Sequence, residues 1–312
     1  MILVTGSLAY DQIMDFPGRF SDHIAPEKVH NLNVSFLVDQ MRKGFGGTAG
    51  NISYTLSLLG IKCAVMGIVG DDFTPYKEFL SRHKIDTSLV KTLPNHYTSQ
   101  AFGITDVRDN QIWGFHTGAD ALSDNLSISN VPKTIDFGVV APHNPKAMVK
   151  FALEYKKKKI PYLFDPGMQL PWLSGDELRR AISGATIIIG NDYEVGVIEK
   201  KIGVKNLHLG YRDKIVVTTL GMHGSKVSKD GKSEMIKAAK VQNASDPAGA
   251  GDAYRAGFVA GFLRKFPLKT CAQMGSVAAA YTVEKYGTTT HSFTIKEFCR
   301  RYQENYRENL TL

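Results

Sequence analysis

The chain has 312 residues, which allows one large α/β domain or two smaller ones, and 43% of its residues are hydrophobic. This content excludes global disorder, and no apolar run approaches the roughly 18–20 residues of a membrane span, so we expect no membrane partner. The net charge of +8 comes from dispersed basic residues without interleaved aromatic ones, so we expect no nucleic-acid partner either.

The first seven residues have the pattern of a strand and lack the basic region of a secretion signal, so we expect a cytoplasmic protein. The cysteines are odd in number and scattered along the chain, at Cys63, Cys271 and Cys299. This spacing argues against a disulfide framework and against a zinc site.

Short β-branched runs alternate with amphipathic stretches along most of the chain. The runs predict strands over 2–5, 63–69, 137–141, 162–164, 186–189 and 215–219. The amphipathic stretches predict helices over 49–59, 75–83, 146–158, 176–183 and 193–202, and the chain after Ala250 is mainly helical. This alternation predicts an α/β fold with a mostly parallel sheet covered by helices on both faces.

Two segments, 12–43 and 95–116, break the alternation. Both carry apolar residues at every second position, as at Leu32, Val34 and Phe36, and at Phe102, Ile104 and Ile112. The run from Arg108 to Asn110 predicts a hairpin turn. We expect the two segments to pair as a small β lid that closes over a site in the main domain (1–11, 44–94 and 117–312) and excludes water. Ordinary edge strands are the alternative.

A glycine-rich run from Asp246 to Asp252 directly precedes a helical pattern. Gly249, Ala250 and Gly251 leave backbone N–H groups uncovered at a helix N-terminus, which is a site for an anion. Asp252 is placed to accept a proton from a hydroxyl beside that anion, a pattern that indicates phosphoryl transfer to an alcohol. The alternative is a tight turn in which Asp252 caps the helix.

A second glycine cluster, 44–50, is followed by Asn51. Gly46 and Gly47 allow a substrate to approach the backbone closely, and Asn51 offers an amide to its hydroxyls. A dinucleotide fingerprint is disfavoured, because a long segment separates the cluster from the first strand. Asp11 lies just past that strand, at the carboxyl end where ligands bind in open α/β sheets.

Asn191 and Glu194 follow a predicted strand and begin a helix. Their oxygens suit Mg²⁺, partly through water, although a capping box explains the same spacing. Residues that close the strand over 215–219 could place a nucleotide's phosphates against the backbone: Thr219, Gly221 and Gly224.

In this order, the motifs resemble the signatures of the ribokinase-like (PfkB) family of sugar and nucleoside kinases over essentially the whole chain. The second signature is matched by the run that ends at Asp252, with Pro247 in place of Thr. The first signature, the Asn-x-x-Glu motif and the nucleotide loop are matched by Gly46, Gly47 and Asn51, by Asn191 and Glu194, and by Thr219, Gly221 and Gly224. The resemblance implies a ribokinase-like three-layer α/β/α sandwich with a small β-sheet lid.

The resemblance also implies roles and cofactors. ATP would be the phosphoryl donor, Asp252 the general base, and the N–H groups from Ala248 to Gly251 the anion hole. Asn191 and Glu194 would organise Mg²⁺. Some family members bind a monovalent cation such as K⁺, which here would lie at the loop around Asp246 and Ala248 and near 287–291. The acceptor's ribose-type hydroxyls would be held by Asp11, Gly47 and Asn51.

Within the family, the chain resembles bacterial and archaeal adenosine or nucleoside kinases. Thr48 stands where ribokinases usually carry Lys, and the predicted lid is rich in aromatic residues such as Phe102 and Phe115, which suit a flat base. These aromatics could instead pack the lid or a dimer interface, so we expect a monomer or a homodimer through the lid. The expected reaction is phosphorylation of the 5′-hydroxyl of a nucleoside, adenosine above all. A kinase for ribose, fructose or a sugar phosphate is the alternative.

Overall fold

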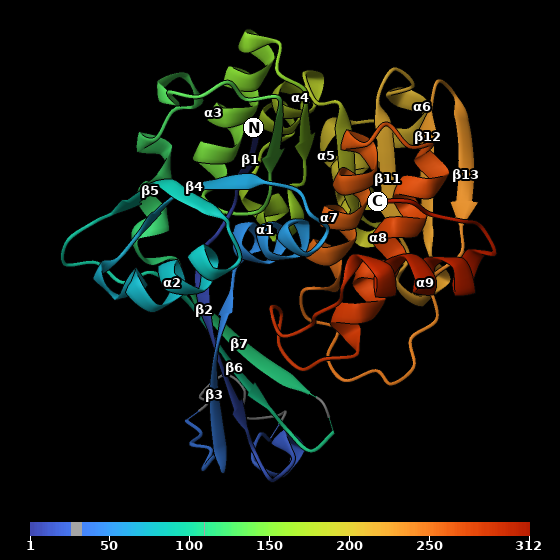
Figure 1. Ribbon diagram of the computed structural model, residues 1–312. Coiled ribbons are helices and arrows are strands. Elements are labelled where there is room, and N and C mark those ends of the chain that lie inside the picture. The colour runs from blue at the N-terminus through green and yellow to red at the C-terminus, as the bar shows by residue number, and fades with distance from the viewer. Residues whose placement is uncertain (26–32, 109) are drawn as a thin grey trace.

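The computed structural model describes residues 1–25, 33–108 and 110–312. Its centre is a nine-stranded sheet in the order β13-β12-β11-β10-β9-β8-β1-β4-β5 (Figure 1). The pairs from β5 to β11 are all parallel, and β12 and β13 add antiparallel. The strands are β1 (Ile2–Thr5), β4 (Cys63–Val69), β5 (Asp86–Thr92), β8 (Phe137–Val140), β9 (Tyr162–Phe164), β10 (Ile187–Asn191), β11 (Ile215–Thr219), β12 (Ser225–Lys229) and β13 (Lys232–Ile236).

Helices cover both faces of this sheet, because alternate side chains of its central strands enter two different cores. Val4 of β1 packs in a core with α1 (Thr48–Leu58), α2 (Thr74–Arg82), α7 (Ala250–Leu263), α8 (Leu268–Val283) and α9 (Ile295–Tyr306). Its neighbour Leu3 packs in the other core, with α3 (Pro145–Lys158), α4 (Gly175–Ser183), α5 (Asp192–Ile202) and α6 (Leu207–Gly210). Strands buried on both faces read as continuous apolar runs. The predicted three-layer α/β/α sandwich is confirmed.

A separate four-stranded sheet in the order β3-β2-β6-β7 projects from one end of the large one (Figure 1). In it β2 and β6 pair in parallel, and the outer strands β3 and β7 pair antiparallel. The strands are β2 (Ala9–Asp15), β3 (Gln40–Gly46), β6 (Ser99–Thr105) and β7 (Gln111–His116). The predicted small sheet is therefore present. Its hairpin between β6 and β7 turns at Arg108 as expected, although Asp109 lies outside the described residues.

The strand expected through Val34 and Phe36 is wrong. Residues 33–38 have no regular structure, and Leu32 lies outside the described residues. The Phe36 ring instead packs against those of Phe16 and Phe20, at centroid distances of 4.9 and 5.0 Å. Phe36 therefore belongs to a small aromatic cluster rather than to a sheet.

The predicted elements of the main domain lie close to their expected ranges, whereas β5 was not predicted. The strands predicted over 2–5, 63–69, 162–164 and 215–219 are confirmed to the residue, and the five helices begin one residue earlier than expected. β10 runs to Asn191 instead of ending at residue 189. Within the described ranges, none of the helices combines the length and apolar character that crossing a membrane requires.

Candidate functional site

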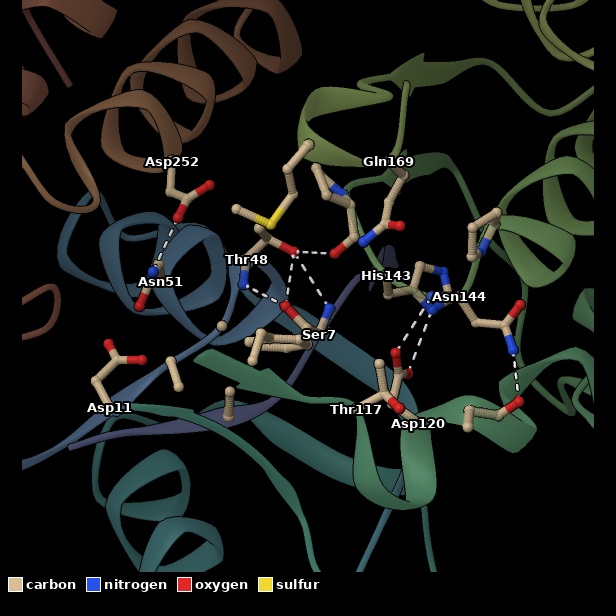
Figure 2. A pocket seen from close by; sticks show the side chains of 18 of the residues that line it. Ser7, Asp11, Thr48, Asn51, Thr117, Asp120, His143, Asn144, Gln169 and Asp252 are labelled. Carbon is tan, nitrogen blue, oxygen red and sulfur yellow. Dashed lines mark hydrogen bonds and ion pairs between the residues drawn. The ribbon is translucent and has the colours of Figure 1, made fainter. Parts of the chain in front are cut away.

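A cavity of about 1200 Å³ lies between the carboxyl ends of the large-sheet strands and the small sheet. Figure 2 shows side chains from the small sheet, from the loops after β1 and β8, and from the first turns of α1 and α7 around it. The predicted site residues that line it are Asp11, Gly47, Asn51, Phe115, Ala248 and Asp252. The carboxyl-end position follows the rule for ligand sites in open α/β sheets.

Asp252 lies in the first turn of α7, where Gly249 precedes the helix with a left-handed φ of 74°. The Asn51 side-chain amide donates a hydrogen bond of 2.8 Å to Asp252 Oδ2 (Figure 2). Burial raises the pKa of Asp252, while the positive charge of Arg255 and the hydrogen bond from Asn51 oppose that rise. Asp252 is therefore a stronger base than an exposed aspartate, and it faces the cavity.

The glycine-rich loop before α7 offers fewer free N–H groups than expected. The N–H of Ala248 donates to Asp246 Oδ1 at 2.9 Å, and the N–H of Ala250 donates to the carbonyl of Pro247 at 3.2 Å. Among the described residues, no acceptor takes the N–H groups of Gly249 and Gly251. These two groups lie at the N-terminus of α7, where an anion is favoured.

Asp246 ties the same loop to the segment after α8. Its second oxygen, Oδ2, accepts a hydrogen bond of 3.0 Å from the N–H of Gly287. The next residue, Thr288, donates to the Phe45 carbonyl at 3.0 Å and lines the cavity. Asp246 is thus placed to hold the loop's shape.

Asp11 reaches the cavity from β2 because a glycine stands beside it. A Cβ at Gly46 would lie 2.1 Å from Asp11 Oδ2, so Gly46 makes room for the carboxylate without lining the cavity itself. Burial, together with the negative charges of Asp252 and Asp246, raises the pKa of Asp11 to about 7, against a weak hydrogen bond from Thr288. At neutral pH this carboxyl group can both donate and accept hydrogen bonds.

Gly47 has a φ of 82° at the start of α1, and a Cβ there would lie 2.5 Å from the Ser7 carbonyl oxygen. Only glycine fits this position without strain. The tight turn lets α1 begin against the cavity and aligns Asn51 one turn later.

The small sheet presents Trp113 and Phe115 of β7 to the cavity. Phe102 does not line it, which corrects the expectation for that residue. The register pairs Ala101 with both Asp11 and Phe115, all on the cavity face, so the next residue, Phe102, lies on the opposite face. On the cavity face, the Trp113 ring packs over Gly103, and a Cβ added at Gly103 would lie 2.7 Å from that ring.

Several lining residues carried no signature in the sequence. Ser7 and Thr48 are joined by a hydrogen bond from the Thr48 N–H to Ser7 Oγ of 3.0 Å, and Thr48 Oγ1 donates to the Pro142 carbonyl at 2.8 Å (Figure 2). Ser7 and Pro142 follow β1 and β8, so their place at carboxyl strand ends was a usable signal. The same wall includes Asp120, His143, Asn144, Met168 and Gln169.

The predicted nucleotide residues meet at the neighbouring carboxyl ends of β10 and β11. Asn191 pairs directly with Thr219 in the sheet. Gly221 follows with a φ of 57°, and Gly224 has a φ of 94° and lies so close to Ile236 that a Cβ would not fit. None of these four residues lines the cavity.

Asn191 and Glu194 form the capping box that was the alternative to a metal site. Asn191 Oδ1 accepts from the Glu194 N–H at 2.8 Å, and Glu194 Oε2 accepts from the Asn191 N–H at 2.7 Å. Nowhere in the described part of the chain do three or more His, Cys, Asp or Glu side chains gather as a metal site. One carboxylate beside a nucleotide loop still suits Mg²⁺, which commonly takes one or two protein carboxylates, water and substrate phosphates.

This geometry can be compared with known proteins. A family model described as "pfkB family carbohydrate kinase" matches residues 5–295. The chain belongs to the pfkB family. The resemblance read from its motifs is thereby confirmed.

Individual relatives agree with membership of the pfkB family. The chain is 31% identical to a "Nucleoside kinase" of Methanothermobacter thermautotrophicus over 308 residues, 96% of this chain and 95% of the relative. Its fold matches that of a Burkholderia thailandensis nucleoside kinase in complex with inosine, with a TM-score of 0.90, 35% identity and 99% of both chains covered. It also matches Methanocaldococcus jannaschii nucleoside kinase, with a TM-score of 0.88, 26% identity and coverage of 97% and 98%.

Proposed function

We propose that this protein transfers the γ-phosphoryl group of ATP to the 5′-hydroxyl of a nucleoside, adenosine in particular, giving AMP and ADP. The observation that carries the proposal is the position of Asp252. Its carboxylate lies at the cavity, in the same helical turn as the free N–H groups of Gly249 and Gly251. The similar nucleoside kinases from three organisms support a nucleoside as acceptor.

In the proposed reaction, Asp252 accepts the proton of the 5′-hydroxyl as that oxygen attacks the γ-phosphorus. Asn51 holds the carboxylate in place through its hydrogen bond of 2.8 Å. The N–H groups of Gly249 and Gly251 stabilise the negative charge of the transferring group. The ribose would be positioned by Asp11, Gly47 and Asn51. The lid formed by segments 12–43 and 95–116 would close over the bound substrates and exclude water.

The proposed nucleotide site comprises Asn191, Thr219, Gly221 and Gly224. Glu194, with Asn191, would hold Mg²⁺ and its waters, and the ion would supply charge neutralisation to the phosphates. We also retain two predictions. The first is a monovalent cation bound at Asp246 and Ala248, and the second is a homodimer formed through the lid.

Adenosine as the acceptor is supported by the side chains of the cavity wall. Trp113 and Phe115 offer flat apolar surfaces to a base, whereas a bare sugar mostly requires hydrogen bonds. The side-chain amide of Gln169 both donates and accepts, which matches the paired donor and acceptor on the adenine edge.

The test is an ADP-release assay with ATP and Mg²⁺ against adenosine, guanosine, inosine, cytidine, ribose, fructose and fructose 6-phosphate. We expect the highest kcat/KM with adenosine. A higher value with another nucleoside would retain the reaction and refute the base preference. A response to the sugars alone would refute a nucleoside as acceptor and favour the sugar kinase alternative.

A further inference from the structure

Arg255 lies three residues after Asp252 on α7 and is 7% exposed. Its guanidinium forms an ion pair with Asp165, which follows β9 and is 1% exposed. A buried arginine requires a carboxylate partner, so this pair alone explains why the residue can be there. It does not explain the two further neighbours of the guanidinium.

The first further neighbour is Glu194, whose Oε2 lies 3.8 Å from Arg255 Nη2. The second is Gly251 in the glycine-rich loop, where a Cβ would lie 2.7 Å from Arg255 Nη1. One planar guanidinium therefore borders the start of α5, the start of α7 and the end of β9. These are the elements that carry the proposed metal carboxylate, the proposed base and the buried anchor.

We propose that Arg255 is a positioning residue for phosphoryl transfer: anchored by Asp165, its guanidinium fixes Glu194 and the Gly251–Asp252 turn relative to each other. The inference rests on the proposed function and extends it to a residue outside the family signatures matched above. Arginine suits this task because its planar fork holds its N–H donors in fixed directions, whereas a lysine ammonium is a compact charge on a flexible stem. Groups that hold catalytic side chains in register contribute to rate without touching substrate.

The charges around Arg255 agree with this role. Burial opposes its charge, but Asp165, Asp252 and Glu194 together keep the pKa of Arg255 above its ordinary value. Arg255 in turn opposes the rise in the pKa of Asp252 that burial causes. The charge of Arg255 thus acts on Asp252 and Glu194 as well as on its ion-pair partner Asp165.

The test separates positioning from simple stabilisation. Arg255→Met alone leaves Asp165 buried without a partner, and we expect a less stable protein. The double variant Arg255→Met/Asp165→Leu removes both charges, and such replacements commonly restore stability. Arg255→Lys is a second route to a folded protein, because it keeps a positive charge beside Asp165. The matched control is Arg301→Lys, since Arg301 is also buried and makes bonds of 2.8 and 2.6 Å to Glu284 outside the cavity.

Three quantities are measured for each variant: Tm, the Kd for adenosine by calorimetry without ATP, and kcat for ADP release. We expect the double variant and Arg255→Lys to bind adenosine within about twofold of wild type but to turn over about 10- to 100-fold more slowly. Arg301→Lys is expected to keep the wild-type kcat. A kcat within about twofold of wild type in either folded Arg255 variant would overturn the proposal.

Failure of this inference is distinguishable from failure of the proposed function. Arg255 lies beside Gly251 and does not line the acceptor cavity. The same loss of kcat is therefore expected with whichever acceptor the wild-type protein phosphorylates. If adenosine is not a substrate but another acceptor is, the Arg255 variants are compared with that acceptor.

Discussion

Two residues on different helices, Asn51 of α1 and Asp252 of α7, meet through one hydrogen bond of 2.8 Å. The glycines before each helix make this meeting possible, because Gly47 and Gly249 both have positive φ angles at helix starts. The proposed base is thus held by a side chain that also faces the cavity. The proposed mechanism assigns the proton transfer to this pair and the positioning role to the buried charge of Arg255.

Asp252→Asn is expected to leave ATP binding largely intact and to lower kcat by roughly 10²–10⁴, because the amide cannot accept the hydroxyl proton. The measurement is ADP release with saturating ATP and adenosine, alongside nucleotide affinity by calorimetry. Asp176→Asn, an exposed carboxylate in the first turn of α4, is the control and should keep full activity. Near-normal turnover by Asp252→Asn would remove it as the base.

The pH dependence of kcat/KM follows from the raised pKa of Asp252. The base must be deprotonated, so activity falls as the pH decreases through that pKa, above the ordinary aspartate value of about 3.9. Asn51→Ser removes a hydrogen bond that favours the charged form, which shifts the acidic limb to higher pH. An unchanged or lower limb in Asn51→Ser would show that another group controls it.

At the scale of elements, the sequence was sufficient where burial alone decides structure. The strand at 63–69 is buried throughout, and so are the first four residues of the strand at 215–219. The parallel sheet was predictable from the alternation of strands and helices along the chain. β3 was missed because its first five residues, Gln40–Gly44, are exposed and carry no apolar alternation. The face on which Phe102 lies depends on strand register, and a shift of one residue reverses it.

The site was predictable to a similar extent. Residues in glycine-rich or capping patterns, such as Asn51 and Asp252, could be predicted from their local spacing in the sequence. His143 in the loop after β8 and Gln169 in a short 3-10 helix (Gly167–Trp172) belong to no repeated pattern, and only the folded chain brings them together at the cavity. In the sequence, nothing distinguishes Arg255 from the other residues of α7. Only the structure shows that it contacts Asp165, Glu194 and Gly251.

The proposed orientation of the small sheet predicts different effects from its two faces. Trp113→Ala is expected to raise the KM for adenosine about 5- to 150-fold, since stacking of a base on an aromatic ring contributes about 1–3 kcal/mol. Phe102→Ala is the matched control on the opposite face and should leave KM within about twofold. The measurement is steady-state kinetics with adenosine varied at saturating ATP. Equal effects at both positions would contradict the proposed use of the cavity face.

At the scale of the whole molecule, two buried histidines link stability to pH. His208 lies between the hydroxyls of Ser228 and Thr218, at 2.6 and 2.8 Å, and His291 lies between those of Thr55 and Thr282, at 3.1 and 3.3 Å. Burial lowers the pKa of each to about 4. The unfolded chain binds protons at these sites near pH 6.5, so it is favoured as the pH falls from 6.5 towards 4.

Each histidine is therefore expected to reduce the free energy of unfolding by up to about 1.4 kcal/mol per pH unit in that window. His291→Gln should show a shallower decrease than wild type between pH 7 and pH 4.5. Urea unfolding at several pH values measures the difference. Parallel curves for the two proteins would contradict a buried, neutral His291.

The most direct test of the whole account is the identity of the product formed from adenosine, ATP and Mg²⁺. Phosphorus–proton coupling in the NMR spectrum shows which ribose carbon carries the new phosphate. The arrangement of Asp252 with the N–H groups of Gly249 and Gly251 predicts 5′-AMP, formed together with one equivalent of ADP. A 2′- or 3′-phosphate, or ADP without a phosphorylated nucleoside, would contradict it.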